Sequence, residues 1–230
     1  MIEKSNHLVT LEKEEEVSLI SLNDENSFNS LSKNLLKELF EALKEADEDN
    51  STKVLVLKGV GRGFSAGHNL KEVQENENES FYRELLNSCK EVMIFLPKLD
   101  KPVIAEVHGV ATAAGCQLVA ACDLAYADTD TRFATPGVNI GLFCHTPLVS
   151  VSRTIVKKHS MEMLLLGDLI GASEAKRFGL INDVFEPTEL HEKVMEIARA
   201  ICSKSPYVIK MGKEISVRGI ATVKVTYRPE

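Results

Sequence analysis

The chain has 230 residues, 44% of them hydrophobic and 27% charged, which is typical of a globular protein with room for one large domain or two small ones. Its 27 basic and 34 acidic residues give a net charge of −7, which argues against a general nucleic-acid-binding protein because such proteins carry a basic stripe. The sequence contains no 18-residue apolar stretch and no signal peptide or basic presequence that we can recognise, so we expect neither a membrane span nor a membrane partner.

The cysteines predict a reducing compartment. Their number is odd, and none forms a C-x-x-C pair; they are Cys89, Cys116, Cys122, Cys144 and Cys202. Free thiols in apolar surroundings are typical of intracellular proteins. We therefore expect the cytoplasm, with the mitochondrial matrix as the alternative.

The first half of the chain predicts a hairpin, a helix and a buried strand. Leu8–Thr10 and Val17–Leu22 read as two strands around a charged turn. Leucines and a phenylalanine at helical spacing predict a helix over Ser32–Asp47, with Ser32 as its N-cap. Val54–Leu57 reads as a buried strand, and the acidic stretch Gln74–Ser80 predicts a mobile loop.

The second half alternates helices and strands. In chain order we predict a helix at Phe81–Leu96, a strand at Pro102–Val107, a small-residue helix at Ala113–Cys122, strands at Leu124–Ala127 and Thr131–Ala134, helices at Ser160–Leu166 and Ser173–Phe178, a strand at Leu180–Val184, and helices at Leu190–Ser203 and Ser205–Lys213. This alternation predicts an α/β fold with a partly parallel sheet. We find no linker, so we expect one domain over residues 1–230, with its core at about 8–215 and an atypical tail at 216–230.

Two turns rich in small residues follow predicted strands. The first is Gly61–Leu70 (G-R-G-F-S-A-G-H-N-L), and the second is His108–Leu118 (H-G-V-A-T-A-A-G-C-Q-L). Small residues let a ligand approach the backbone, and the start of a helix leaves N–H groups without partners. Two such turns brought together can direct two amides at one oxygen atom, as in an oxyanion hole.

Other chemistries have weaker support in the sequence. Gly63–Gly67 matches the G-x-S-x-G pattern of serine hydrolases, but seven positions separate the strand end near Lys58 from Ser65. No histidine pair has the spacing of a zinc site, so we expect no metal. Basic residues near the two turns in sequence are candidates for a local anion-binding cluster; they are Lys58, Arg62, Lys71, Lys98 and Lys101.

The motifs, in their order and spacing, resemble the crotonase (enoyl-CoA hydratase/isomerase) superfamily over residues 8–215. The segments that carry the resemblance are Phe64–Leu70, Lys101–Ala105 with His108-Gly109, Ala114–Leu118, Cys122–Leu124, Phe133–Pro136, Gly171–Ala175 and Gly179–Ile181. The resemblance implies an α/β crotonase (ClpP-like) fold of repeated ββα units. It also implies a lyase or isomerase of fatty-acid metabolism that stabilises an enolate-like intermediate of an acyl-CoA thioester.

The same resemblance assigns roles to residues. The oxyanion-hole amides are those of His68 and Ala114, and coenzyme A lies along Ala66, Gly67, His68, Asn69 and Leu70 with Ala114. Hydratases of the superfamily carry two catalytic glutamates, and this chain has Gln117 and Gly137 at those positions. Acid–base catalysis through that pair is therefore doubtful, a departure shared by one subgroup of the superfamily.

Three alternatives remain open at this stage. The first is an enzyme in which Gln117 orients water or substrate, and in which His145 or the ring of His68 replaces the missing glutamates as the acid–base group. A non-catalytic binder of CoA thioesters is a second possibility, and a serine hydrolase acting through Ser65 is a third. The resemblance implies no cofactor beyond the coenzyme A of the substrate. It implies a homotrimer or hexamer, although the helical region that forms it in the superfamily looks shortened here.

Overall fold

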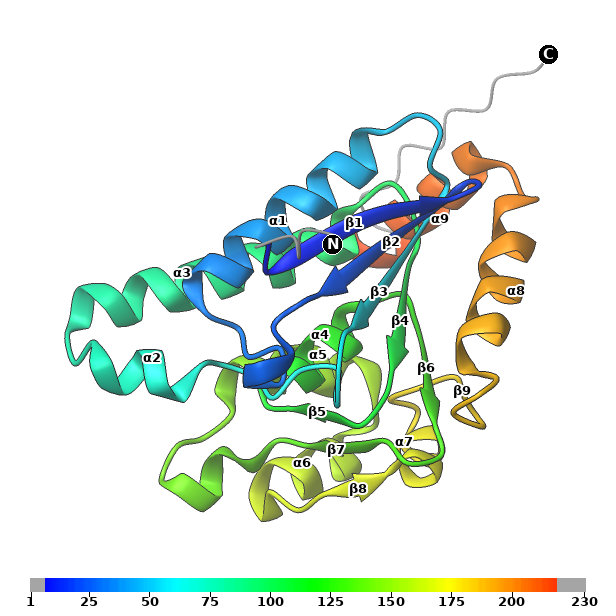
Figure 1. Cartoon of the computed structure of the whole chain (residues 1–230). Helices are drawn as coiled ribbons and strands as arrows, with labels where there is room; N and C mark the ends of the chain where they lie inside the picture. Colours follow the sequence, from blue (N-terminus) through cyan, green and yellow to red (C-terminus); the bar gives the residue numbers. More distant parts are fainter. Residues whose placement is uncertain (1–6, 219–230) are drawn as a thin grey trace.

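The computed structural model describes residues 7–218 and is organised around a six-stranded sheet (Figure 1). Its strand order is β1-β2-β3-β4-β6-β9, in which β1 pairs antiparallel with β2 and all other neighbours are parallel. The strands are β1 Val9–Glu14, β2 Val17–Leu22, β3 Val54–Gly59, β4 Val103–Val107, β6 Leu124–Asp128 and β9 Asp183–Phe185. The predicted α/β fold with a partly parallel sheet is confirmed.

A second sheet of three short strands, in the order β5-β7-β8, lies across the end of the main sheet where β3 and β4 finish (Figure 1). Its strands are β5 Val110–Thr112, β7 Arg132–Ala134 and β8 Ile170–Gly171. The small sheet and the small-residue turns therefore share the carboxyl edge of the parallel strands. In α/β sheets this edge is where ligand sites are usually built.

Helices cover both faces of the main sheet. Those of the described chain are α1 Lys33–Glu48, α2 Leu70–Glu75, α3 Glu79–Phe95, α4 Ala114–Ala121, α5 His145–Thr154, α6 Lys157–Leu166, α7 Ala172–Phe178, α8 Leu190–Cys202 and α9 Pro206–Arg218, with 3₁₀ turns η1 Glu25–Ser27, η2 Leu96–Lys98 and η3 Pro136–Ile140. Leucines of α1 and α3 pack with Leu22 and Leu57 on one face, and α8 packs on Val54 and Val56 on the other. Burial on both faces explains why the parallel strands read as continuous apolar runs.

Most predicted elements are present. The hairpin is confirmed, and Ser32 caps α1 as predicted, since its hydroxyl accepts a hydrogen bond from the Leu35 N–H at 3.2 Å. Residues 216–218 continue α9, which is longer than the predicted helix. The rest of the predicted atypical tail, 219–230, lies outside the described residues.

One prediction is wrong, and two elements were not predicted. The expected loop Gln74–Ser80 is mostly helical: α2 runs to Glu75, and α3 begins at Glu79 because the Asn78 side chain caps it. The second turn contains β5, which pairs with β7 and is too short for an alternating pattern to reveal. Helix α5 was not predicted, because its Thr, Ser and Pro residues weaken the helical signal.

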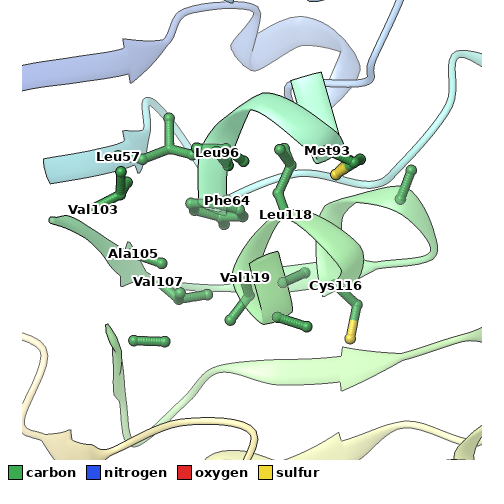
Figure 2. Close-up of a cluster of buried hydrophobic side chains, with 14 of the residues drawn as sticks. Leu57, Phe64, Met93, Leu96, Val103, Ala105, Val107, Cys116, Leu118 and Val119 are labelled. Atoms are coloured by element: carbon green, nitrogen blue, oxygen red, sulfur yellow. The ribbon is translucent and has the colours of Figure 1, made fainter. Parts of the chain in front are cut away.

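Phe64 fixes the first turn to the core. Its side chain is fully buried, and Figure 2 shows it among side chains from four elements: Leu57 of β3, Val103 of β4, Leu96 of η2 and Leu118 of α4. A buried phenylalanine contributes several kcal/mol to stability. The backbone that follows Phe64 is therefore anchored to the hydrophobic core.

Within residues 7–218, no helix combines the length and apolar character needed to cross a membrane. No group of three or more His, Cys, Asp or Glu side chains in the same range forms a possible metal site.

Candidate oxyanion site

The first small-residue turn is held between two backbone segments. On one side the Ser65 N–H donates to the Val110 carbonyl of β5 at 3.0 Å. On the other side the Leu31 N–H donates to the Gly67 carbonyl at 2.7 Å. The turn therefore behaves like an extra strand between β5 and the segment before α1, and its remaining amides have fixed directions.

Glycines allow the two small-residue turns to touch. A Cβ atom at Gly67, whose φ is +86°, would lie 2.8 Å from the Thr112 carbonyl oxygen and 3.1 Å from the Ala114 nitrogen. A Cβ at Gly115 would overlap the Ser65 carbonyl oxygen. Real Cβ atoms do not approach so closely, so side chains here would separate the turns. The contact brings the residue after Gly67 next to the start of α4.

Two backbone N–H groups at this contact have no partner. Neither the His68 N–H nor the Ala114 N–H donates a hydrogen bond to any group within residues 7–218. Ala114 is the first residue of α4, where an N–H has no intrahelical acceptor. The preceding Ala113 has φ 49° and ψ −117°, a conformation that non-glycine residues rarely adopt and that is often retained at functional sites. The structure thus brings together the two predicted oxyanion-hole residues.

Three side-chain polar atoms near these amides are also buried without partners in the described chain: His68 Nε2, Gln117 Oε1 and Thr135 Oγ1. Gln117 lies one turn into α4. Thr135 follows Ala134, whose carbonyl accepts the Ala113 N–H at 2.9 Å. Buried polar atoms normally have partners. The Gln117 Oε1 atom is therefore available to accept a hydrogen bond, and its role in orienting water or substrate stays a prediction.

The site carries little charge at neutral pH. Residues 109–122 and 133–152, which form the second turn, α4, η3 and most of α5, contain no Asp, Glu, Lys or Arg. Burial lowers the pKa of His68, raises the pKa of Cys144, and raises the pKa of Cys116 to about 12. Desolvation thus favours the neutral form of all three groups.

Cys144 occupies the space beside Gly137. The Gly137 N–H donates to the Cys144 Sγ at 3.3 Å, and a Cβ at Gly137 would lie 2.9 Å from that sulfur and 2.8 Å from the Leu142 carbonyl oxygen. The loop between these residues folds back on itself, with the Leu142 N–H donating to the Gly137 carbonyl at 2.9 Å. The backbone therefore leaves no room for a glutamate at 137.

His145 lies on the surface at the start of α5. Its residue is exposed, and its Nδ1 lies 3.0 Å from the Phe143 carbonyl oxygen of its own loop. Within residues 7–218, the His145 side chain hydrogen-bonds to this loop alone and not to His68 or Gln117. Its role as an acid–base group stays a prediction, and its exposure counts against a buried position beside the substrate.

Ser65 has the surroundings of a structural residue. It is fully buried, and its hydroxyl donates to the Asn29 carbonyl at 2.8 Å and accepts the Gly67 N–H at 3.3 Å. Strand β3 ends at Gly59, so Ser65 does not occupy the sharp strand-to-helix turn of a nucleophile elbow. These contacts count against a serine hydrolase.

The residues predicted to contact coenzyme A differ in how accessible they are to a ligand. Ala66 is exposed and Leu70 is 52% exposed, whereas the Asn69 side chain caps α2 by accepting the Glu72 N–H at 3.1 Å. The Ala66 N–H is already used by the Phe28 carbonyl at 2.9 Å. The exposed side of this segment is thus the surface that a ligand can reach.

The five basic residues do not form one cluster. Lys101 donates to carbonyls at the carboxyl end of α1, and Lys98 lines a cavity of about 470 Å³ with Lys210. Both precede β4 and lie at the amino edge of the parallel strands, opposite the turns. Arg62 stays near the first turn, with its guanidinium 4.4 Å from the centre of the Phe28 ring.

Asn29 is a residue of the site that sequence reasoning missed. It is fully buried at φ 52°, and its side-chain amide donates to the Val60 and Gly63 carbonyls at 2.9 and 2.8 Å while its Oδ1 accepts the Asp24 N–H at 2.8 Å. Asparagine tolerates this left-handed conformation better than most residues. The run Asn23–Asn29, rich in Asn, Asp and Ser, was the available signal of a structured turn.

Comparisons with known proteins point to one family. The family model described as enoyl-CoA hydratase/isomerase matches residues 12–229. Enoyl-CoA hydratase domain-containing protein 3, mitochondrial, of Danio rerio is 41% identical over 211 residues, covering 92% of this chain and 73% of that protein.

Two crystal structures each superpose with a TM-score of 0.90. One is an enoyl-CoA hydratase of Mycobacterium smegmatis, 41% identical, with 95% of this chain and 85% of that chain covered. The other is human enoyl-CoA hydratase domain-containing protein 3, 38% identical, with 95% and 86% covered. The predicted crotonase fold and the predicted resemblance to the enoyl-CoA hydratase/isomerase superfamily are confirmed.

The contact between the turns predicts an unequal response of two glycines. Gly67 and Gly179 both have φ +86°, but nothing lies within 4 Å of a Cβ at Gly179. Gly179→Ala should cost about 1–2 kcal/mol for the left-handed backbone alone. Gly67→Ala should cost about 1–3 kcal/mol more because its methyl group overlaps Thr112 and Ala114. Urea unfolding of both variants measures the difference, and equal losses would show that the turns are not in contact.

The half-buried His68 ring, whose Nε2 is shielded from solvent, predicts acid sensitivity. Because burial lowers its pKa below the ordinary 6.5, the unfolded chain binds a proton that the native chain excludes as the pH falls below about 6.5. The free energy of unfolding should therefore fall from pH 7.5 to 5.5 more in the wild type than in His68→Gln. Urea unfolding at both pH values tests this, with substitution of the exposed histidine, His145→Gln, as the matched control. A wild type and a His68→Gln variant of equal pH dependence would contradict a half-buried neutral ring.

Proposed function

Because the chain belongs to the enoyl-CoA hydratase/isomerase family, we propose that it binds an acyl-CoA thioester and polarises its carbonyl between the N–H groups of His68 and Ala114. The observation that carries the proposal is that both N–H groups lack partners among residues 7–218, at the place where Gly67 touches the start of α4. An enolate-like intermediate places negative charge on that carbonyl oxygen. Two fixed donors in a water-poor site stabilise such charge by about 3–4 kcal/mol each.

The step after polarisation has weaker support. Gln117 can orient a water molecule or the acyl group by hydrogen bonding, but an amide cannot take up a proton as a carboxylate does. The other expected glutamate position is Gly137, whose space Cys144 fills. Among the nearby titratable groups, the predicted acid–base residue His145 and the half-buried His68 are the candidates for moving protons. We therefore propose a hydratase or isomerase of reduced or altered activity.

A non-catalytic acyl-CoA-binding protein is the second candidate. The uncharged segments 109–122 and 133–152 favour it, because they supply donors and apolar walls but no carboxylate. Binding and turnover must therefore be measured separately.

The name of the Danio rerio relative includes the word mitochondrial, which supports a mitochondrial location; the cytoplasm remains the alternative. All five cysteines are free thiols, in keeping with either reducing compartment. We further propose that the chain works in fatty-acid metabolism.

We also propose that the chain forms a homotrimer or hexamer. Exposed apolar side chains are concentrated in η3, α5, α6 and the loops beside them; they are Ile140, Leu142, Phe143, Val149, Val156, Leu165, Leu166 and Leu169. Asn139 of η3 donates to the Gly167 carbonyl at 3.2 Å, which joins η3 to the end of α6. Apolar surface of this extent is typical of an association site.

The thioester proposal is tested by two assays on the full chain. Calorimetric titration with butyryl-CoA should give a Kd on the order of micromolar. Hydration of crotonyl-CoA should be more than about tenfold slower than by a two-glutamate hydratase assayed alongside, because position 137 has no carboxylate and position 117 has an amide. A chain that binds no butyryl-CoA would contradict both candidates. Turnover within tenfold of the reference would contradict the importance of the missing glutamates, and binding without turnover would select the second candidate.

The association proposal is tested by light scattering on a gel-filtration column. The wild type should have three or six times the mass of one chain. Leu165→Glu with Leu169→Glu should shift it toward the monomer, since charges at these positions would be desolvated in an interface. Leu86→Glu, an exposed position on α3, serves as the control and should leave the mass unchanged. A monomeric wild type would contradict the proposal.

A further inference from the structure

We propose that Ser65 is a positioning residue for the oxyanion hole, which it serves by fixing the direction of the His68 N–H through Gly67. This inference rests on the proposed binding of an acyl-CoA thioester. It gives the serine of the G-x-S-x-G match a role that is neither nucleophilic nor limited to filling space.

Peptide geometry carries the first step of the argument. The Gly67 carbonyl and the His68 N–H belong to one planar peptide unit and point in opposite directions across it. The Leu31 N–H donates to that carbonyl at 2.7 Å. The orientation of the His68 N–H is thereby set by a hydrogen bond on the far side of the same peptide plane.

Ser65 fixes the preceding peptide unit. Its hydroxyl oxygen accepts the Gly67 N–H at 3.3 Å and donates its proton to the Asn29 carbonyl at 2.8 Å. Gly67 needs such support, because glycine moves between backbone conformations more readily than any other residue and its φ is +86°. With both of its polar groups bonded, Gly67 has one orientation, and the His68 N–H has one direction.

Asn29 makes the other end of this connection rigid. Its N–H donates to the Asp24 carbonyl at 2.8 Å, and its side-chain amide donates to the Val60 and Gly63 carbonyls. The Ser65 backbone is held separately, since its carbonyl accepts the Thr112 N–H at 3.0 Å. The hydroxyl of Ser65 therefore bridges two fixed segments, and it bonds directly to the residue that precedes the oxyanion donor.

The test compares two ligands that differ only at the carbonyl. Butyryl-CoA is a thioester with the oxygen that the two amides would hold, and S-butyl-CoA is a thioether without it. The ratio of their dissociation constants isolates the contribution of the carbonyl contacts. We expect wild-type chain to prefer the thioester by at least about tenfold.

Ser65→Ala should lower this preference by about fivefold or more while changing the thioether Kd less than about twofold. Ser18→Ala is the matched control, because it also removes a buried hydroxyl, the one 2.7 Å from Thr52 Oγ1, at a distance from the site in β2. It should keep the wild-type preference. If Ser65→Ala does not fold, Ser65→Cys keeps the volume and replaces the hydroxyl by a weaker hydrogen-bonding group, and it should lower the preference in the same direction.

The outcomes separate the two proposals. A wild type that binds both ligands, with a Ser65 variant that keeps the thioester preference or weakens both ligands equally, would overturn the positioning role and leave acyl-CoA binding standing. A wild type that binds both ligands equally well would overturn the oxyanion role and the positioning role together. A wild type that binds neither would overturn the proposed function and this inference with it.

Discussion

The site depends on one steric constraint: two backbone segments touch where no side chain fits. Gly67 lies against Thr112 and Ala114, and Gly115 lies against the Ser65 carbonyl. Around this contact, Phe64 anchors the first turn from the core, and β5 and Leu31 hold it from either side. The surrounding segments are bonded to one another, whereas the N–H groups of His68 and Ala114 have no hydrogen-bond partner among residues 7–218. A preorganised pair of donors of this kind needs no rearrangement when charge develops on a ligand.

The second feature is the absence of charge in the segments that line this contact. The pKa shifts of His68, Cys116 and Cys144 all favour the neutral form, and residues 109–122 and 133–152 carry no carboxylate or ammonium group. Uncharged surroundings strengthen the hydrogen bonds of the two amides but supply no carboxylate to accept a proton. The geometry thus supports polarisation of a bound carbonyl more strongly than proton transfer.

At position 137 the conformation of the backbone, as well as the sequence, excludes a glutamate side chain. Cys144 and the Leu142 carbonyl occupy the space in which a side chain at 137 would begin. The short loop that places them there is closed by hydrogen bonds to both backbone polar groups of Gly137. Departure from the two-glutamate pattern is therefore a property of the whole segment from η3 to α5.

The sequence by itself determined the α/β class, nearly all long helices and parallel strands, and the family, and it predicted the two oxyanion residues. It did so because apolar periodicity and small-residue turns are local signals, and the order of the motifs is specific. Only the tertiary structure decided where the polar side chains lie and which of them already have hydrogen-bond partners. It showed that the Ser65 hydroxyl is occupied, that His145 is exposed, that Lys98 and Lys101 lie at the opposite edge of the sheet, and that Asn29 supports the first turn. These facts depend on packing between residues far apart in the chain, such as Asn29 and Ser65, 36 positions apart, and Ala46 and Lys101, 55 positions apart. Local sequence patterns carry no information about such contacts.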